Sequence, residues 1–169
     1  MRRFTMVQDI ALDLDEHWRL FLDDDFDKKM YLEGFGFPRY ELLDHRDGEA
    51  ESFRRIRVVP KLDVPGPVAK ILGSSFAYTE EQTFDKKART SRSRVVPSVL
   101  ADRLGSDSAV RAEAAGAGKT RRTIDISVEA RIFGIGGMVE SALEKNLRTG
   151  WDNAAAYMNK HAAQNAQKK

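Results

Sequence analysis

The 169-residue sequence contains no cysteine. This absence excludes disulfide bonds, metal sites built from thiolates and a cysteine nucleophile. Histidine is scarce as well, because His17, His45 and His161 stand far apart and none has the H-x-x-x-H spacing of paired metal ligands. No serine lies in a G-x-S-x-G turn, which would expose a hydrolase nucleophile. We therefore expect neither a metal ion nor a cofactor.

Long apolar runs are also missing. No stretch approaches the roughly 18–20 apolar residues that span a bilayer, and residues 1–18 lack the hydrophobic core of a signal peptide. At roughly 100–200 residues per domain, the length corresponds to one domain. We expect a cytoplasmic protein with a single domain over residues 1–163 and a polar, disordered tail over residues 164–169.

The basic residues of the sequence are not concentrated on one predicted element. Residues 1–51 hold 7 Lys and Arg against 14 Asp and Glu, whereas residues 52–169 hold 21 against 12. Proteins that bind nucleic acid gather basic residues on one element, among aromatics. Here they are scattered along strand-like segments, as at Arg55 and Arg57 or Arg92 and Arg94. This favours a solvated sheet face, so we expect no nucleic-acid partner.

The longest regular pattern is an amphipathic helix over residues 136–161. Apolar residues recur there at the three- and four-residue steps of one helix face. They are Val139, Leu143, Leu147, Trp151, Ala154 and Met158. Gly134, Gly136 and Gly137 precede them, and glycine lets the chain turn sharply and the helix begin close to its neighbour. A stripe of this length needs a sheet to cover it.

The remaining residues have the pattern of one strand, two short helices and six strands. Residues 4–12 resemble a strand, Asp13 with Glu16 starts a helix like a capping box, and a second helix from about Asp25 ends at Gly34. Strand-like segments follow at 37–44, 52–59, 74–84, 88–96, 108–115 and 120–131, joined in pairs by short turns. The order predicts an α+β domain, with an antiparallel sheet of six to seven strands curled around the final helix.

Three connections of this sheet share one end, because successive connections of an up-and-down sheet alternate ends. They are residues 60–73, where Pro67 suits the start of a short helix that ends at Gly73, residues 97–107 and residues 131–137. Their apolar residues are Val64, Val68, Ile71, Leu72, Val99, Leu100, Leu104, Phe133 and Ile135, with Lys61, Lys70, Arg103 and Arg131 around them. The pattern indicates either a cavity mouth, suited to an anionic membrane surface or a lipophilic ligand, or a plug that closes the core.

Two further patterns touch on chemistry. Residues 115–120 look like a phosphate-binding loop, but Glu113 stands where G-x-x-x-x-G-K-[ST] requires glycine, and a strand follows instead of a helix. Tyr40, Tyr78 and Glu80 are candidates for acid–base groups on the covered face of the sheet. A tyrosine buried for its ring, with its hydroxyl satisfied, is the commoner case. We therefore name no catalytic residue.

Four phrases carry a family resemblance: Met30-Tyr31-Leu32-Glu33-Gly34, Gly36-Phe37-Pro38-Arg39-Tyr40-Glu41, Pro65-Gly66-Pro67-Val68 and Gly136-Gly137-Met138-Val139-Glu140. Over about residues 3–160 the chain resembles an uncharacterised bacterial branch of the START-like (SRPBCC) superfamily. This resemblance implies the helix-grip fold, with a hydrophobic cavity between the sheet and the C-terminal helix. Members bind lipids, hormones or polyketides, and some are enzymes.

The resemblance implies that the protein binds or transfers a lipid or another hydrophobic small molecule. We expect the cavity to be lined by Tyr40, Phe76, Tyr78, Ile126, Val139, Leu143, Leu147 and Trp151, and its mouth by Val64, Val68, Ile71, Leu72, Val99, Leu100, Phe133 and Ile135. Two alternatives stay open. One is a polyketide-cyclase or aromatase-like enzyme that uses the same cavity, and the other is a protein-interaction module whose cavity is filled by side chains.

Overall fold

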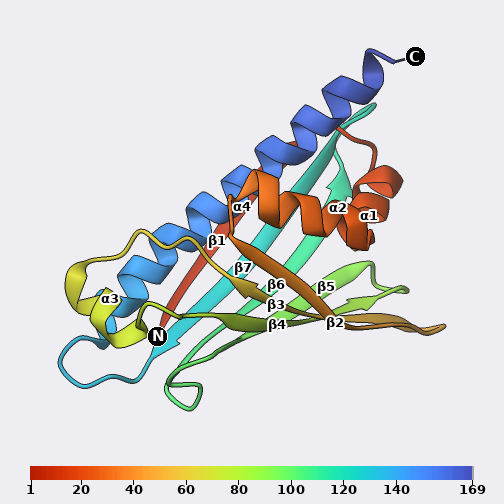
Figure 1. The fold of residues 1–169 in the computed structure, drawn as a ribbon. Coiled ribbons are helices and arrows are strands. Elements are labelled where there is room, and N and C mark those ends of the chain that lie inside the picture. The colour runs from red at the N-terminus through yellow and green to blue at the C-terminus, as the bar shows by residue number, and fades with distance from the viewer. Residues whose placement is uncertain (169) are drawn as a thin grey trace.

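Seven antiparallel strands curl around the C-terminal helix in the structure, a computed structural model that describes residues 1–168 (Figure 1). The strands are β1 (Arg2–Ile10), β2 (Arg39–Asp47), β3 (Glu51–Val59), β4 (Tyr78–Asp85), β5 (Thr90–Pro97), β6 (Leu104–Ala114) and β7 (Thr120–Ala130). Their order in the sheet is β1-β7-β6-β5-β4-β3-β2, so the first strand closes against the last. The predicted α+β helix-grip architecture is confirmed.

Local sequence explains where the short helices begin. The helices are α1 (Leu14–Leu22), α2 (Asp24–Lys29), the π-helical turn η1 (Met30–Gly34), α3 (Gly66–Leu72) and α4 (Gly136–Ala166). The Asp13 carboxylate accepts the Glu16 N–H at 2.9 Å, and the Asp23 carboxylate caps α2 in the same way. The expected second helix is thus divided into α2 and η1. Gly73, at a φ of 77°, ends α3 as predicted.

The long helix α4 begins directly against the end of β7. A Cβ atom on Gly136 would overlap the carbonyl oxygen of Ala130, and Glu140 Oε1 accepts the Ala130 N–H at 3.0 Å. The helix runs to Ala166, so it takes in three residues of the expected tail. Lys169 lies outside the described residues, and disorder of the tail stays a prediction. No helix of the described chain is long and apolar enough to cross a membrane.

The sheet buries its concave face and exposes its convex face. Along β7, Ile124, Ile126 and Val128 point inward and are buried with Trp18 and Phe21 of α1. On the other face Arg55, Arg57, Arg92 and Arg94 are exposed, as their pattern predicted. Figure 1 shows α1 and α2 covering one end of the sheet and α3 the other.

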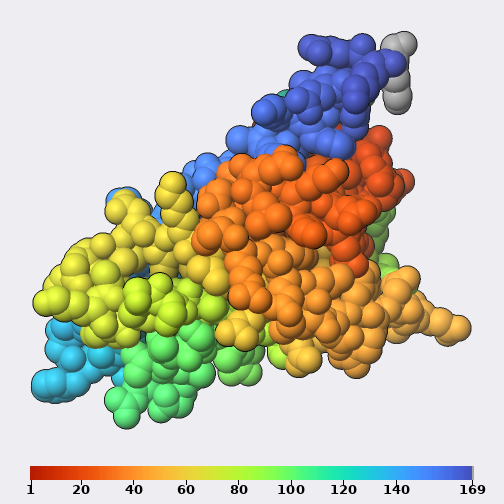
Figure 2. All heavy atoms as spheres, viewed as in Figure 1, coloured from red at the N-terminus to blue at the C-terminus, as the bar shows by residue number. Residues whose placement is uncertain are grey.

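The three apolar connections do gather at one end, where they form a packed cluster (Figure 2). We call this the end cluster, and its buried members are Val68, Leu72, Leu104, Ala130, Val139 and Ala142. Val64, Val99, Leu100 and Ile135 pack around it and are partly buried. Phe133 differs, since its side chain is fully exposed. This packing favours the plug interpretation over a mouth for most of these residues.

Candidate functional site

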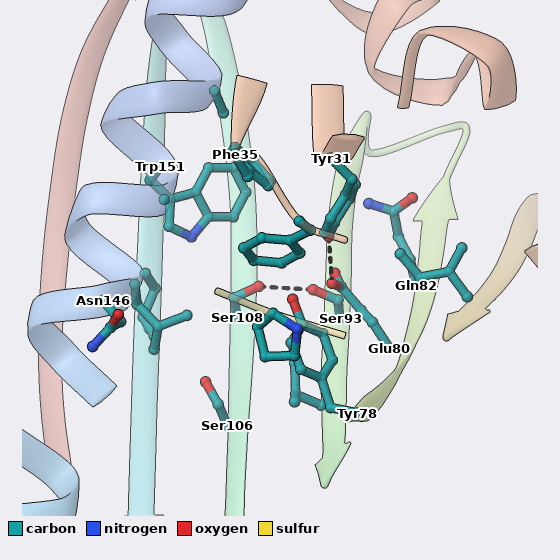
Figure 3. A pocket seen from close by; sticks show the side chains of 18 of the residues that line it. Tyr31, Phe35, Tyr78, Glu80, Gln82, Ser93, Ser106, Ser108, Asn146 and Trp151 are labelled. Carbon is teal, nitrogen blue, oxygen red and sulfur yellow. Dashed lines mark hydrogen bonds between the residues drawn. The ribbon is translucent and has the colours of Figure 1, made fainter. Parts of the chain in front are cut away.

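A cavity of about 180 Å³ lies between the concave face of the sheet and α4. Its floor is made of short side chains, Ser93 of β5 with Ser106 and Ser108 of β6, which leave room where larger residues would fill the core. Figure 3 shows Trp151 of α4 and Phe35, just after η1, above this floor. Most of the lining is apolar, so the cavity suits a ligand with a hydrophobic body.

Six of the eight residues expected to line the cavity do so: Phe76, Tyr78, Ile126, Leu143, Leu147 and Trp151. Two do not. Val139 is buried in the end cluster, because it lies on the first turn of α4, which packs against the end of β7. Tyr40 turns its hydroxyl toward α2, where it donates to Asp27 Oδ2 at 2.9 Å.

None of the eight residues expected at the mouth lies in the cavity lining. Val64, Val68, Ile71, Leu72, Val99, Leu100, Phe133 and Ile135 belong to the connections at the end of the sheet, beyond the cavity. On that side the lining is formed instead by Pro60, Leu62, Pro97 and Leu104. The physical reason is that α3 folds back onto α4. The apolar face of α3 is therefore buried against α4 and does not face the cavity.

A hydrogen-bonded pair, Tyr31 of η1 and Glu80 of β4, faces the cavity. The Tyr31 hydroxyl donates to Glu80 Oε2 at 2.9 Å (Figure 3). Burial, and then the charge of Glu80, raise the pKa of both Tyr31 and Tyr78 above the usual value. At neutral pH both phenols are therefore protonated donors beside a carboxylate. The cavity wall thus carries acid–base groups that a bound molecule can contact.

A buried ion pair ties α2 to the sheet beside the cavity. Arg54 of β3, 7% exposed, donates through Nη2 to Asp27 Oδ1 at 3.2 Å and to Gln82 Oε1 at 2.7 Å. Burial raises the pKa of Asp27 to about 6, against the opposing charge of Arg54. With the Tyr40 bond, these contacts join α2 to β2, β3 and β4. They hold α2 and η1 over the cavity.

A second buried guanidinium, Arg122 of β7, lines the cavity beside Trp151. Its Nε and Nη2 donate to Gln8 Oε1 at 3.2 and 2.6 Å, and its Nη1 donates to Met158 Sδ at 3.4 Å. The guanidinium lies over the Trp151 ring, 5.1 Å from the centroid. Burial lowers the pKa of Arg122 to about 10, so it remains charged at neutral pH.

The polar residues Asp27, Arg54 and Arg122 were not predicted from the sequence. A signal for the two arginines was present. Because strand side chains alternate between faces, Arg122 is in phase with Ile124 and Arg54 with Ile56, on the apolar side. Among residues 1–168, no group of three or more His, Asp or Glu side chains is arranged to hold a metal ion.

Comparison with solved structures supports the same fold over almost the whole chain. Zhui aromatase/cyclase from Streptomyces sp. R1128 is 17% identical with a TM-score of 0.65, and the match covers 93% of each chain. A START superfamily protein from Mycobacterium smegmatis is 13% identical, with a TM-score of 0.61 over 96% of this chain and 97% of the other. Norcoclaurine synthase from Thalictrum flavum is 14% identical, with a TM-score of 0.63 over 96% and 86%.

These similarities place the chain in the START-like fold. No curated protein matches it. Residues 5–161, nearly the whole chain, match the family described as "Protein of unknown function (DUF2505)". The chain therefore belongs to that family, which has the START-like helix-grip fold expected from its sequence.

Proposed function

We propose that this protein binds a compact hydrophobic molecule in the cavity between the sheet and α4. The observation that carries the proposal is an apolar cavity of about 180 Å³ with a few polar groups on its wall. Pockets for drug-sized ligands measure roughly 300–1,000 Å³, and a cavity of about 150 Å³ can hold benzene. The size therefore favours a ligand of one or two rings over a lipid with two acyl chains.

One structural neighbour supports this size class. Norcoclaurine synthase from Thalictrum flavum has been solved in complex with dopamine and hydroxybenzaldehyde, two single-ring compounds. The open space also favours ligand binding over the alternative of an interaction module whose cavity is filled by side chains. A cytoplasmic location stays a prediction.

Organic extraction of the purified protein, followed by mass spectrometry, tests the proposal. We expect a co-purifying ring compound in a ratio near one per chain. Ser106→Leu fills the cavity floor without breaking a hydrogen bond and should abolish this capture. Thr123→Leu, on the convex face of β7, is the matched control and should retain it. An unchanged yield from the Ser106 variant would rule out binding in this cavity.

An acid–base enzyme that acts in the same cavity is the second candidate. The Tyr31–Glu80 hydrogen bond favours it, since this bond fixes a carboxylate in the cavity wall, where it can abstract a proton from a bound molecule. Hydrogen–deuterium exchange at the α-carbon of 2-tetralone, followed by NMR in D₂O, tests this reaction. We expect wild type to accelerate the exchange and Glu80→Gln to remove the acceleration. Equal exchange rates with the two proteins would exclude Glu80 as the base.

We further propose that the end of the molecule with Phe133 contacts an anionic membrane surface. Phe133 is fully exposed in the loop between β7 and α4. Lys70 and Arg131 are exposed at the same end. An aromatic side chain with basic neighbours suits the interface of an anionic bilayer.

A further inference from the structure

Arg122 is a buried cation in the cavity wall that no carboxylate of the described chain neutralises. Its side chain is 1% exposed. Arg54 in the same core has Asp24 and Asp27 at 3.4 and 3.2 Å. Within residues 1–168, no Asp or Glu oxygen lies within 4 Å of the Arg122 guanidinium. Burying a charge without a partner is strongly unfavourable, so the missing anion needs an explanation.

The partners of Arg122 hold its guanidinium in place without neutralising it. A guanidinium has five N–H donors. Gln8 Oε1 takes one from Nε and one from Nη2, and Met158 Sδ takes one from Nη1, which leaves two donors, one on each terminal nitrogen. Gln8 is itself fixed, since its Nε2 donates to Asp152 Oδ1 at 2.9 Å. The side chain is thus oriented in advance, with two donors free.

The nearby histidine adds no second positive charge beside Arg122. His17 of α1 is fully buried, and neither ring nitrogen has a hydrogen-bond partner among the described residues. Burial first, and then the charges of Arg122 and Arg89, lower the pKa of His17 to about 3. The ring is therefore neutral at physiological pH. The groups in direct contact with the Arg122 guanidinium are neutral, namely the Gln8 amide, the Met158 thioether and the Trp151 ring, and the Asp152 carboxylate is linked to it only through Gln8.

We propose that the ligand carries a carboxylate that pairs with Arg122, while its apolar body lies along Leu147 and Ile126. Two donors on adjacent terminal nitrogens match the two oxygens of a carboxylate, which a planar guanidinium binds in a bidentate manner. The inference rests on the proposed binding function and names its ligand class, a compact aromatic or alicyclic acid. The cost of burying Arg122 is then offset when the acid is bound.

Two probes of the same shape and different charge test this inference. We would measure the affinities of 2-naphthoate and 2-naphthamide by titration calorimetry at pH 7. Wild type should bind the carboxylate about ten- to hundredfold more tightly, the range for hydrogen bonds to a charged group. Arg122→Met should remove this preference, so that the variant binds the two probes with equal affinity. Arg92→Gln, on the exposed convex face, is the control and should preserve the preference.

The possible outcomes separate this inference from the binding function on which it rests. Equal affinities of wild type for the two probes would overturn the carboxylate inference and leave cavity binding intact. If wild type binds neither probe, both proposals fail. The comparison within wild type decides the question even if Arg122→Met does not fold.

Discussion

At the scale of single residues, His17 makes the stability of the protein depend on pH. It is 0% exposed and packs against Trp18 and Phe21, with ring centroids 5.0 and 5.9 Å away. Its pKa falls from 6.5 to about 3, mainly because burial disfavours the charged ring. Between these values the unfolded chain binds a proton that the folded chain does not. The stability that neutral His17 contributes to the folded state is therefore complete above pH 6.5, and it is lost as the pH falls towards 3.

We predict that His17 alone reduces the free energy of unfolding by about 3 kcal/mol between pH 6.5 and pH 4. Urea denaturation of wild type and His17→Phe at several pH values measures this quantity. Phenylalanine keeps the ring contacts and does not titrate, so the variant should lose less stability over this interval. Parallel pH profiles for the two proteins would contradict the assignment.

Gly136 and Gly137 form a matched pair for the start of α4. A methyl group on Gly136 would overlap the Ala130 carbonyl oxygen, whereas nothing lies within 4 Å of the corresponding position on Gly137. We predict that Gly136→Ala costs about 1–3 kcal/mol, since the helix must move away from β7. Gly137→Ala should be neutral or stabilising by up to about 1 kcal/mol. Thermal denaturation measures both, and equal effects would refute the close approach.

At the scale of elements, the burial of α3 in the end cluster indicates that this helix closes the core and is not a lid. Leu72 and Val68 are buried against α4 and β6, as expected of a plug. We predict that Leu72→Ala lowers the free energy of unfolding by about 2–5 kcal/mol, measured by urea denaturation. Lys70→Ala, on the exposed side of the same helix, should change it by less than about 0.5 kcal/mol. A stable Leu72 variant would instead restore α3 as a lid over an entrance.

Periodicity explains why the elements could be predicted from the sequence. The stripe from Val139 to Met158 has the period of a helix face, and Ile124, Ile126 and Val128 alternate as a half-buried strand does. Local patterns of this kind depend on neighbours in the chain. The π-helical turn at Met30–Gly34 could not be predicted. A π-helix differs from an α-helix in its hydrogen bonds, which join residues five and not four apart, and over a single turn this leaves the spacing of apolar residues almost unchanged.

At the scale of the whole molecule, the cavity depends on contacts between distant segments. Lining positions on one strand or helix face, such as Tyr78 or Leu147, followed from the resemblance and the periodicity together. The buried charged residues could not be predicted in this way. Arg54 meets Asp27 across α2 and β3, and Arg122 meets Gln8 across β7 and β1. No local pattern carries such pairings, because they depend on how the sheet closes.

If the exposed Phe133 enters a membrane, the whole molecule is oriented with this end towards the bilayer. Its side chain lies beyond the end cluster, in a loop that also holds Gly134 at a φ of 80°. Burial of an exposed phenylalanine in a bilayer interface contributes up to about 1.5–3 kcal/mol. We predict that Phe133→Ser weakens binding to phosphatidylserine vesicles about tenfold or more, measured by co-sedimentation.

Charge and position provide the controls for this prediction. Leu43→Ser removes an exposed apolar residue from the edge strand β2 and should leave vesicle binding unchanged. The contribution of Lys70 and Arg131 should weaken as salt rises, because ions screen their attraction to anionic lipids. Phosphatidylcholine vesicles should therefore bind less than phosphatidylserine vesicles at low salt, and equally at high salt. If Phe133→Ser and Leu43→Ser reduce binding to the same extent, the contact is not directed by this end and the membrane proposal fails.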